Sequence, residues 1–177
     1  MRALVVFDSM FGSTRALAEA IAGTLEHSGV TTTLTTAASA PRSIAGYDLV
    51  IVGAPTHAHT LPQASSRTEA AGWAADPAKA LTLEPSAHDP GVREWLKGLV
   101  VPDPAPHVAA FSTRVDIARI LAGDAAVSIA KRLRPLGVRH VEQECFLVTK
   151  SSALLEGERL RAEHWAERLF ALAGVTV

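Results

Sequence analysis

The sequence lacks several features that mark particular classes of protein. Its single cysteine, Cys145, excludes an internal disulfide and a cysteine-rich metal site. No apolar run approaches the roughly 20 residues that a membrane-spanning helix requires, and Met1-Arg2 leads directly into a strand-like run without the pattern of a signal peptide. The formal net charge of −1 provides no field for nucleic acid or an anionic membrane. We therefore expect a cytoplasmic protein that binds neither nucleic acid nor membrane.

The first part of the chain predicts an anion site. Leu4–Phe7 is a short apolar run typical of a buried strand, and Ser9–Ser13 is a small, polar loop that contains a glycine. From Ala16 onward, apolar residues recur with helical spacing. A strand, a tight loop and a helix in this order direct the loop amides and the positive end of the helix at one point, where a phosphate can bind. An ordinary helix start, with Ser13 or Thr14 as the N-cap, is the alternative.

The loop does not match the two commonest phosphate-binding motifs. A nucleoside-triphosphate loop ends in Gly-Lys-Ser/Thr, and this loop contains no lysine. The dinucleotide fingerprint needs three spaced glycines, of which only Gly12 is present. What remains is a set of amides with the hydroxyls of Ser9, Ser13 and Thr14, which suits a single terminal phosphate.

Strand-like and helix-like segments alternate along the 177 residues, a length that suits one domain over 1–177. Five strands are predicted over Leu4–Phe7, Val30–Thr36, Tyr47–Gly53, Val108–Phe111 and Val138–Val148. The second lacks clear alternation and suits a sheet edge, and the fifth is interrupted by the polar residues 142–144. Helical patterns lie near 16–25, 92–99, 126–133 and 162–172. The alternation predicts a three-layer α/β sandwich with a parallel sheet.

A long connection at about 61–90 departs from this regular pattern. We expect a short helix at about Thr68–Ala75, with Trp73 facing inward. The segment is either a lid or interface beside the site or a mobile surface insertion.

Two motifs resemble those of the flavodoxin family. Ser9-Met10-Phe11-Gly12-Ser13-Thr14 resembles the family's phosphate loop, Ser/Thr-x-Thr-Gly-Asn-Thr, with Phe11 and Ser13 in place of Thr and Asn. Leu49–His57 resembles the family's strand that ends in Gly-x-Pro-Thr-Trp. The resemblance implies a flavodoxin-like five-stranded sheet of order 2-1-3-4-5 and non-covalent binding of flavin mononucleotide (FMN).

The resemblance also implies which residues contact FMN. The phosphate would lie on Ser9, Met10, Phe11, Gly12, Ser13 and Thr14, and the ring along Pro55, Thr56, His57 and Ala58, with Ser112, Thr113 and Arg114 in a third loop after strand four. His57 replaces the family's stacking aromatic residue, and the third loop has no tyrosine. Arg114 would stabilise the negative charge that reduction places on the ring.

Three functions are compatible with these residues. The resemblance favours an FMN-binding electron-transport protein with a redox partner protein, as a monomer or homodimer, with no catalytic side chain. A small FMN-dependent, quinone-type reductase and a flavin-free binding module are the alternatives. The pair His57-x-His59, completed by His88 or Asp89, could ligate zinc, but the longer motif of metallohydrolases is missing, so we expect no metal site.

Overall fold

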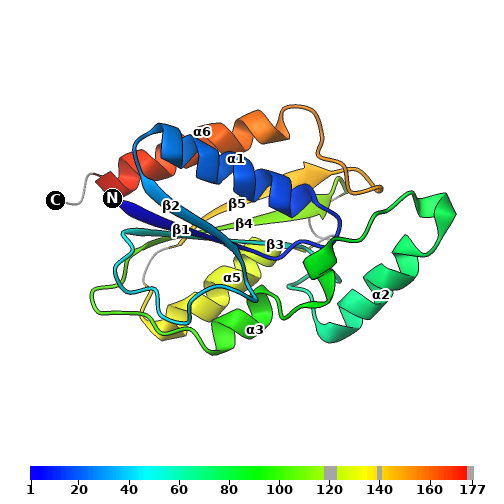
Figure 1. The fold of residues 1–177 in the computed structure, drawn as a ribbon, viewed down its shortest axis with the longest axis horizontal. Helices are drawn as coiled ribbons and strands as arrows, with labels where there is room; N and C mark the ends of the chain where they lie inside the picture. The colour runs from blue at the N-terminus through cyan, green and yellow to red at the C-terminus, as the bar shows by residue number, and fades with distance from the viewer. Residues whose placement is uncertain (118–122, 139–140, 175–177) are drawn as a thin grey trace.

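The computed structural model describes residues 1–117, 123–138 and 141–174, and its centre is a five-stranded parallel sheet (Figure 1). The strands are β1 (Arg2–Phe7), β2 (Thr31–Thr36), β3 (Leu49–Pro55), β4 (His107–Val115) and β5 (Val141–Val148). Their spatial order is β2-β1-β3-β4-β5, and every neighbouring pair is parallel. The predicted strand order 2-1-3-4-5 is therefore confirmed, with β2 at an edge.

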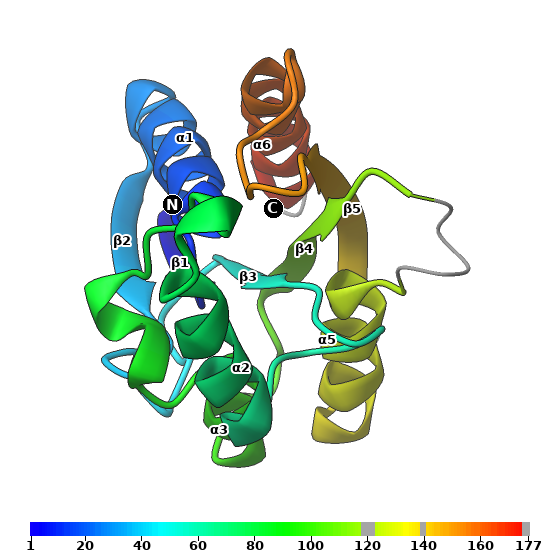
Figure 2. The same cartoon turned by 90° about the vertical axis from the view of Figure 1, so that its right-hand side faces the viewer.

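Helices cover both faces of the sheet and complete the three layers (Figure 2). The helices α1 (Ser13–His27) and α6 (Glu158–Gly174) pack on one face, and α3 (Val92–Lys97) and α5 (Ala125–Leu133) pack on the other. Each face has its own buried apolar cluster, one including Leu17, Phe111 and Trp165 and the other Trp95 and Ile129. The predicted α/β sandwich is confirmed.

The bounds of β4 and β5 differ from those expected. β4 continues to Val115, so Ser112, Thr113 and Arg114 belong to the strand and not to a loop after it. β5 runs without a break through 142–144, because it is an edge strand and polar side chains there reach solvent. The predicted start of this strand includes residues 139–140, which lie outside the described part of the chain.

The open edge of β5 is blocked by two side chains of α6. Arg161 donates a hydrogen bond to the Cys145 carbonyl (2.5 Å), and the Leu147 amide donates to Glu158 Oε2 (2.8 Å). Arg161 also pairs with Glu144 (2.7 Å). These contacts satisfy backbone groups that would otherwise be open to another strand.

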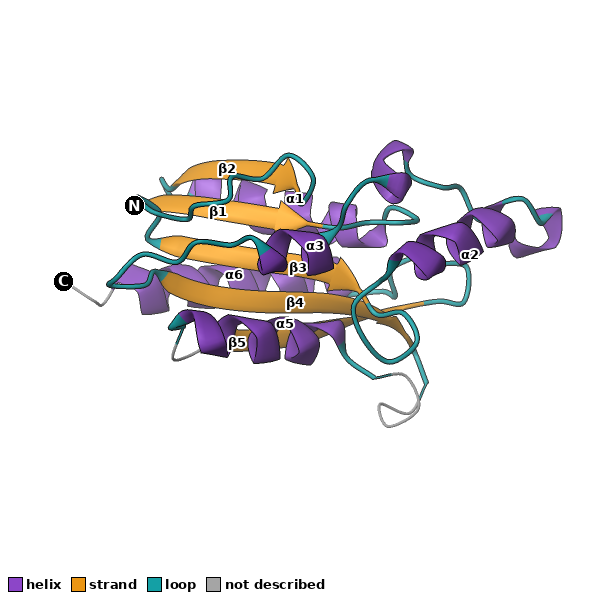
Figure 3. Cartoon of the chain, turned by 90° about the horizontal axis from the view of Figure 1, so that it is seen from below, coloured by secondary structure: helices purple, strands orange, loops and turns teal. Residues whose placement is uncertain are grey.

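The connection after β3 contains more helix than expected. Helix α2 (Ala64–Ala74) begins four residues before the predicted position, and two 3₁₀ turns, Pro77–Lys79 and Pro85–His88, follow it. Figure 3 shows this segment beyond the carboxyl ends of the strands. Within the described residues, no helix is both long and apolar enough to cross a membrane.

Candidate functional site

The two loops singled out in the sequence lie side by side at the carboxyl edge of the sheet. β1 pairs with β3 up to Phe7 and Gly53, and the Asp8 amide donates to the Gly53 carbonyl (2.9 Å). The sequence order of strands reverses between β1 and β3, and parallel sheets bind ligands in the crevice at such a point. The topology therefore places both motifs where a ligand site is expected.

Gly53 has a steric reason to be glycine. A Cβ atom built there would lie 2.0 Å from Phe111 Cζ on the neighbouring strand. The absent side chain lets the Phe111 ring lie against β3, where it makes an edge-on contact with Trp165 (6.3 Å between centroids). The glycine of this motif therefore allows Phe111 to pack closely against β3 beneath the site.

The loop after β1 leads into α1 without a side-chain cap. Gly12 holds the N-cap position with φ of 95°, and its amide donates to Ser9 Oγ (3.1 Å). The alternative of Ser13 or Thr14 as N-cap is therefore wrong. By contrast, α5 is capped by Asp124, which accepts from the Ala126 amide (2.9 Å). The first-turn amides of α1 thus have no side-chain acceptor and can serve an anion.

The hydroxyls of this loop connect it to the far strands. Thr14 Oγ1 and Thr113 Oγ1 are 3.0 Å apart in a buried contact, and Ser13 Oγ donates to the Ser152 carbonyl. The loop after β1 is thereby attached both to β4 and to the connection after β5. Sequence spacing gives no indication of these contacts, which join residues about 100 or more positions apart.

The loop after β3 contains a tight turn of unusual composition. His57 and Thr60 exchange backbone hydrogen bonds (2.9 and 3.0 Å), and the two residues between them have positive φ, 44° at Ala58 and 68° at His59. This is the pattern of a type I′ turn, which prefers Asn-Gly because side chains are strained at positive φ. Such strain is retained only where the surrounding contacts require it.

Helix α2 holds the His57 side chain. His57 Nε2 lies 2.8 Å from Glu69 Oε2, and the rings of His57 and Trp73 are 5.4 Å apart at a tilt of 36°. Lys79 Nζ lies over the Trp73 ring, 5.8 Å from its centroid. Trp73 therefore faces His57, the residue that takes the place of the family's aromatic.

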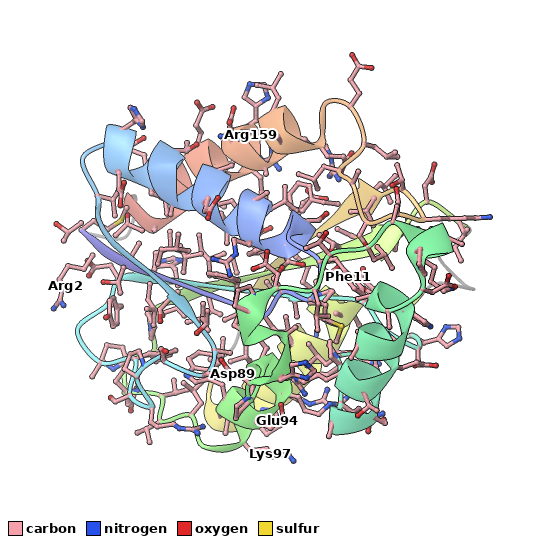
Figure 4. The ribbon with its side chains drawn as sticks, turned by 45° about the vertical axis from the view of Figure 1, so that its right-hand side comes forward. Arg2, Phe11, Asp89, Glu94, Lys97 and Arg159 are labelled. Carbon is pink, nitrogen blue, oxygen red and sulfur yellow. The ribbon has the colours of Figure 1, made fainter. Side chains whose placement is uncertain are left out.

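These segments enclose a cavity of about 120 Å³. Its lining comprises Met10, Phe11, Ser13, Thr14, Pro55, Thr56, His57, Trp73, Leu81, Thr113, Arg114, Val115, Val148, Lys150 and Ser152. In Figure 4, Phe11 lies between the start of α1 and α2. Most of the predicted contact residues therefore meet in one space.

Four predicted contact residues do not line this cavity: Ser9, Gly12, Ala58 and Ser112. Ser9 and Gly12 shape the loop after β1, and Ala58 belongs to the strained turn. Ser112 is fully buried, and its hydroxyl donates to Asp124 (2.8 Å), so it supports the start of α5. Sequence reasoning missed Leu81, Val148, Lys150 and Ser152, because only the packing of the long connection and the turn after β5 brings them here.

Two ion pairs attach the long connection to the residues around the loop after β1. Arg67 of α2 reaches Asp8, the residue before the loop (3.2 Å), and also Glu94 (3.4 Å). Arg15, just after the loop, pairs with Glu84, whose amide donates to the Met10 carbonyl (2.8 Å). The segment at 61–90 thus packs against both ends of the loop.

The buried pair also changes the ionisation of Asp8. Burial raises the pKa of the Asp8 carboxyl above its ordinary value, while the charge of Arg67 opposes this rise. A Cβ at Gly91 would lie 2.0 Å from Asp8 Oδ2, so the backbone at this glycine closes directly over the carboxylate. Burial likewise raises the pKa of the Cys145 thiol, which leaves it protonated at neutral pH.

Two other candidate sites, a second cavity and a metal site, have less support. A larger cavity of about 610 Å³ lies at the opposite edge of the sheet, beside Pro104 and Leu172, and contains none of the predicted residues. In the described ranges, no group of three or more His, Cys, Asp or Glu residues converges as a metal site would require, and His57 is engaged by Glu69.

Comparison with known proteins agrees with this geometry. Residues 4–67 match the sequence model of the flavodoxin domain. No curated relative matches the sequence. Among solved structures, the chain is similar to oxidised flavodoxin 1 from Bacillus cereus, with 16% identity and a TM-score of 0.65 over 97% of this chain and 98% of that one.

Two further solved structures give the same result. A flavodoxin from Streptococcus pneumoniae is 19% identical with a TM-score of 0.63, over 97% of this chain and 99% of that one. A flavodoxin from the domain Archaea is 15% identical with a TM-score of 0.62, over 98% of this chain and 99% of that one. At such identities the likeness concerns the fold. The strand order and the matched segment together show that this chain has the flavodoxin-family fold, with a match to the family's sequence model over residues 4–67.

Proposed function

We propose that this protein binds FMN non-covalently in the cavity between the loops after β1 and β3 and transfers electrons to or from a redox partner protein. The observation that carries the proposal is the uncapped start of α1, which opens into the same cavity as Pro55, Thr56 and His57. When bound, FMN would supply the electron-carrying ring. The chain itself binds and orients it, and we expect this to take place in the cytoplasm.

The phosphate end of FMN fits the residues present. The amides of the first turn of α1 and the positive end of the helix favour a dianion without a lysine. Gly12, at φ of 95°, lets the loop adopt a backbone that other residues rarely take. The loop is also braced from β4 through Thr14 and Thr113, so it is organised before a ligand arrives.

The ring end needs more space than the cavity provides. Sites for ligands of this size usually measure about 300 Å³ or more, whereas this cavity measures about 120 Å³. Trp73 closes it by lying on His57. Binding the three-ring system would therefore require α2 to move Trp73 away from His57, after which either ring could stack on the flavin.

A small FMN-dependent reductase is the second candidate. It is favoured by Trp73 and Leu81, two residues of the long connection that line the cavity and could contact a substrate beside the flavin. An electron carrier would transfer electrons without such a contact. Turnover of a quinone by the FMN-loaded protein without any partner protein would favour the reductase.

The proposal is tested by titrating the purified protein with FMN while flavin fluorescence is recorded, together with its absorption spectrum. Saturable quenching at one FMN per chain, or a yellow protein, supports the site. A colourless protein with no quenching at tens of micromolar FMN would exclude both flavin-dependent functions and leave the flavin-free binding module.

Two glycines of the same region provide a matched pair of variants. Gly12→Val should weaken FMN binding by about tenfold or more, because a branched side chain is strained at positive φ and the loop must change shape. Gly23→Ala is the control, since Gly23 lies inside α1 with open space around it. Equal affinities for both variants would show that the loop does not hold the phosphate.

A further inference from the structure

Residues 71–83, the outer part of the long connection, are attached to the body of the protein mainly on either side. Before this segment, Arg67 pairs with the buried Asp8 (3.2 Å). After it, the Glu84 amide donates to the Met10 carbonyl (2.8 Å). Between these two points, the hydrogen bonds of 71–83 within the described chain all stay inside the long connection. Figure 3 shows the end of α2 and the turn after it projecting away from the sheet.

The contacts of this segment with the cavity are made by packing. The Trp73 ring lies 5.4 Å from the His57 ring, and Leu81 also lines the cavity. His57 itself is held from outside the segment, because Glu69 in the preceding turn of α2 binds its Nε2 (2.8 Å). A segment whose contacts with the body break no hydrogen bond on separation opens more readily than the core elements.

Gly72 marks the point at which α2 can unwind. It directly precedes Trp73 in the last turn of the helix, it is exposed, and a Cβ built there would meet nothing within 4 Å. Packing therefore gives no reason for a glycine here, whereas glycine inside a helix weakens it. The buried residues of α2, which are Ser66, Arg67 and Ala70, all precede Gly72.

The turn that follows α2 is strained in the observed position. Ala80 ends the 3₁₀ turn Pro77–Lys79 with φ of 50°, a conformation that a residue with a Cβ rarely takes. Such strain persists only where surrounding contacts hold it. Lys79 Nζ lies 5.8 Å from the Trp73 centroid, so the strained turn and the ring over the cavity are in contact with one another.

We propose that residues 71–83 are a flap over the cavity, which opens about Gly72 and lifts Trp73 from His57 to admit the flavin ring. The inference rests on the proposed FMN site and specifies how the ligand reaches it. With the flap closed, the cavity of about 120 Å³ is too small for a three-ring system. The rate of FMN association is then proportional to the fraction of molecules whose flap is open.

The first measurement needs no ligand. The amides of Ala75 and Asp76 donate to the carbonyls of Ala71 (3.1 Å) and Trp73 (3.2 Å), so they exchange with deuterium when the last turn of α2 unwinds. Their exchange rates are measured by NMR in the FMN-free protein. His57→Ala removes the contact under Trp73 and should speed this exchange by about two- to tenfold. An unchanged rate would show that the turn unwinds independently of the cavity and would overturn the inference.

The second measurement is the rate of FMN association, followed by stopped-flow fluorescence. Gly72→Ala strengthens the last turn of α2, and we expect it to slow amide exchange and FMN association by the same factor, about two- to fivefold. The factors should agree because both rates depend on the fraction of open flap. Gly23→Ala, inside α1 with equally open space around it, is the control that should change neither rate. Urea unfolding of each variant verifies that it is folded.

Failure of the flap and failure of the FMN site give different results. Slower exchange in Gly72→Ala with an unchanged rate of FMN association would overturn the flap and leave the FMN site intact. Failure of the wild type to bind FMN would overturn the proposed function. Amide exchange in His57→Ala would then still decide whether the Trp73 contact closes the flap.

Discussion

Arg67 Nη2 lies 3.2 Å from Asp8 Oδ2, and both side chains are almost completely buried, with 7% and 5% of their surfaces exposed. Asp8 directly follows β1 and precedes the loop that leads into α1, and Arg67 belongs to the helix that carries Trp73. The long connection is therefore attached to the site by a charge pair within the protein interior. Its position is coupled to that of the loop.

We predict that Arg67→Met lowers the free energy of unfolding by about 3–5 kcal/mol, because it leaves the buried Asp8 carboxylate without a compensating positive charge. The double variant Asp8→Asn with Arg67→Met should recover much of this loss, since no buried charge then remains uncompensated. Urea unfolding of the single and double variants measures both. Additive losses in the double variant would show that the two residues do not interact energetically.

The loss in Arg67→Met should also depend on pH. The pKa of Asp8 is already raised by burial, and removal of the Arg67 charge raises it further. A carboxyl with a raised pKa keeps its proton in the folded state after the unfolded chain has lost it, so its contribution to stability falls as pH rises. The deficit relative to the wild type should therefore shrink as pH is lowered from 7 toward 5. A deficit that is constant over this range would contradict the assignment.

We predict that Glu84→Gln tightens FMN binding severalfold. Glu84 brings a carboxylate next to the proposed phosphate loop, where its Oε1 would lie 3.3 Å from a Cβ built on Gly12. It also forms an ion pair with Arg15. The variant removes the repulsion and frees a cation, while the backbone bond from residue 84 to Met10 is retained.

The gain should be specific for the phosphate. Riboflavin, which lacks the phosphate, should bind the Glu84→Gln variant and the wild type equally, and the gain for FMN should decrease with added salt. Asp89→Asn, an exposed carboxylate in the same connection, is the control. Equal tightening for riboflavin and FMN would mean that the variant acts by loosening the connection instead.

We predict that His59→Gly raises the free energy of unfolding by about 1 kcal/mol. His59 has φ of 68° in the turn between His57 and Thr60, and glycine adopts this conformation without strain. Thermal or urea unfolding measures the gain, with His88→Gly, a residue in a 3₁₀ turn with no positive φ, as the control that should not gain. A loss of stability would show that the His59 side chain makes compensating contacts.

The element pattern of this protein could be predicted because its strands and helices are locally consistent. Leu4–Phe7 and Leu49–Val52 are continuous apolar runs, as expected for strands covered on both faces. The predicted bounds of the fourth and fifth strands were less accurate. The polar residues at 142–144 suggested a break in the fifth strand, yet an edge strand tolerates polar side chains. Ser112 and Arg114 appeared to follow the fourth strand, although pairing with β5 extends that strand to Val115.

The sequence by itself determined the fold class and singled out the two loops that meet at the carboxyl edge of the sheet, because each rests on local periodicity and short motifs. Only the tertiary structure decided what surrounds them. It placed Trp73 on His57, attached the long connection through Arg67 and Glu84, and brought Lys150 beside Arg114. These contacts join residues far apart in the chain, and their energies come from burial and charge pairing that exist only after the sheet and its helices have packed.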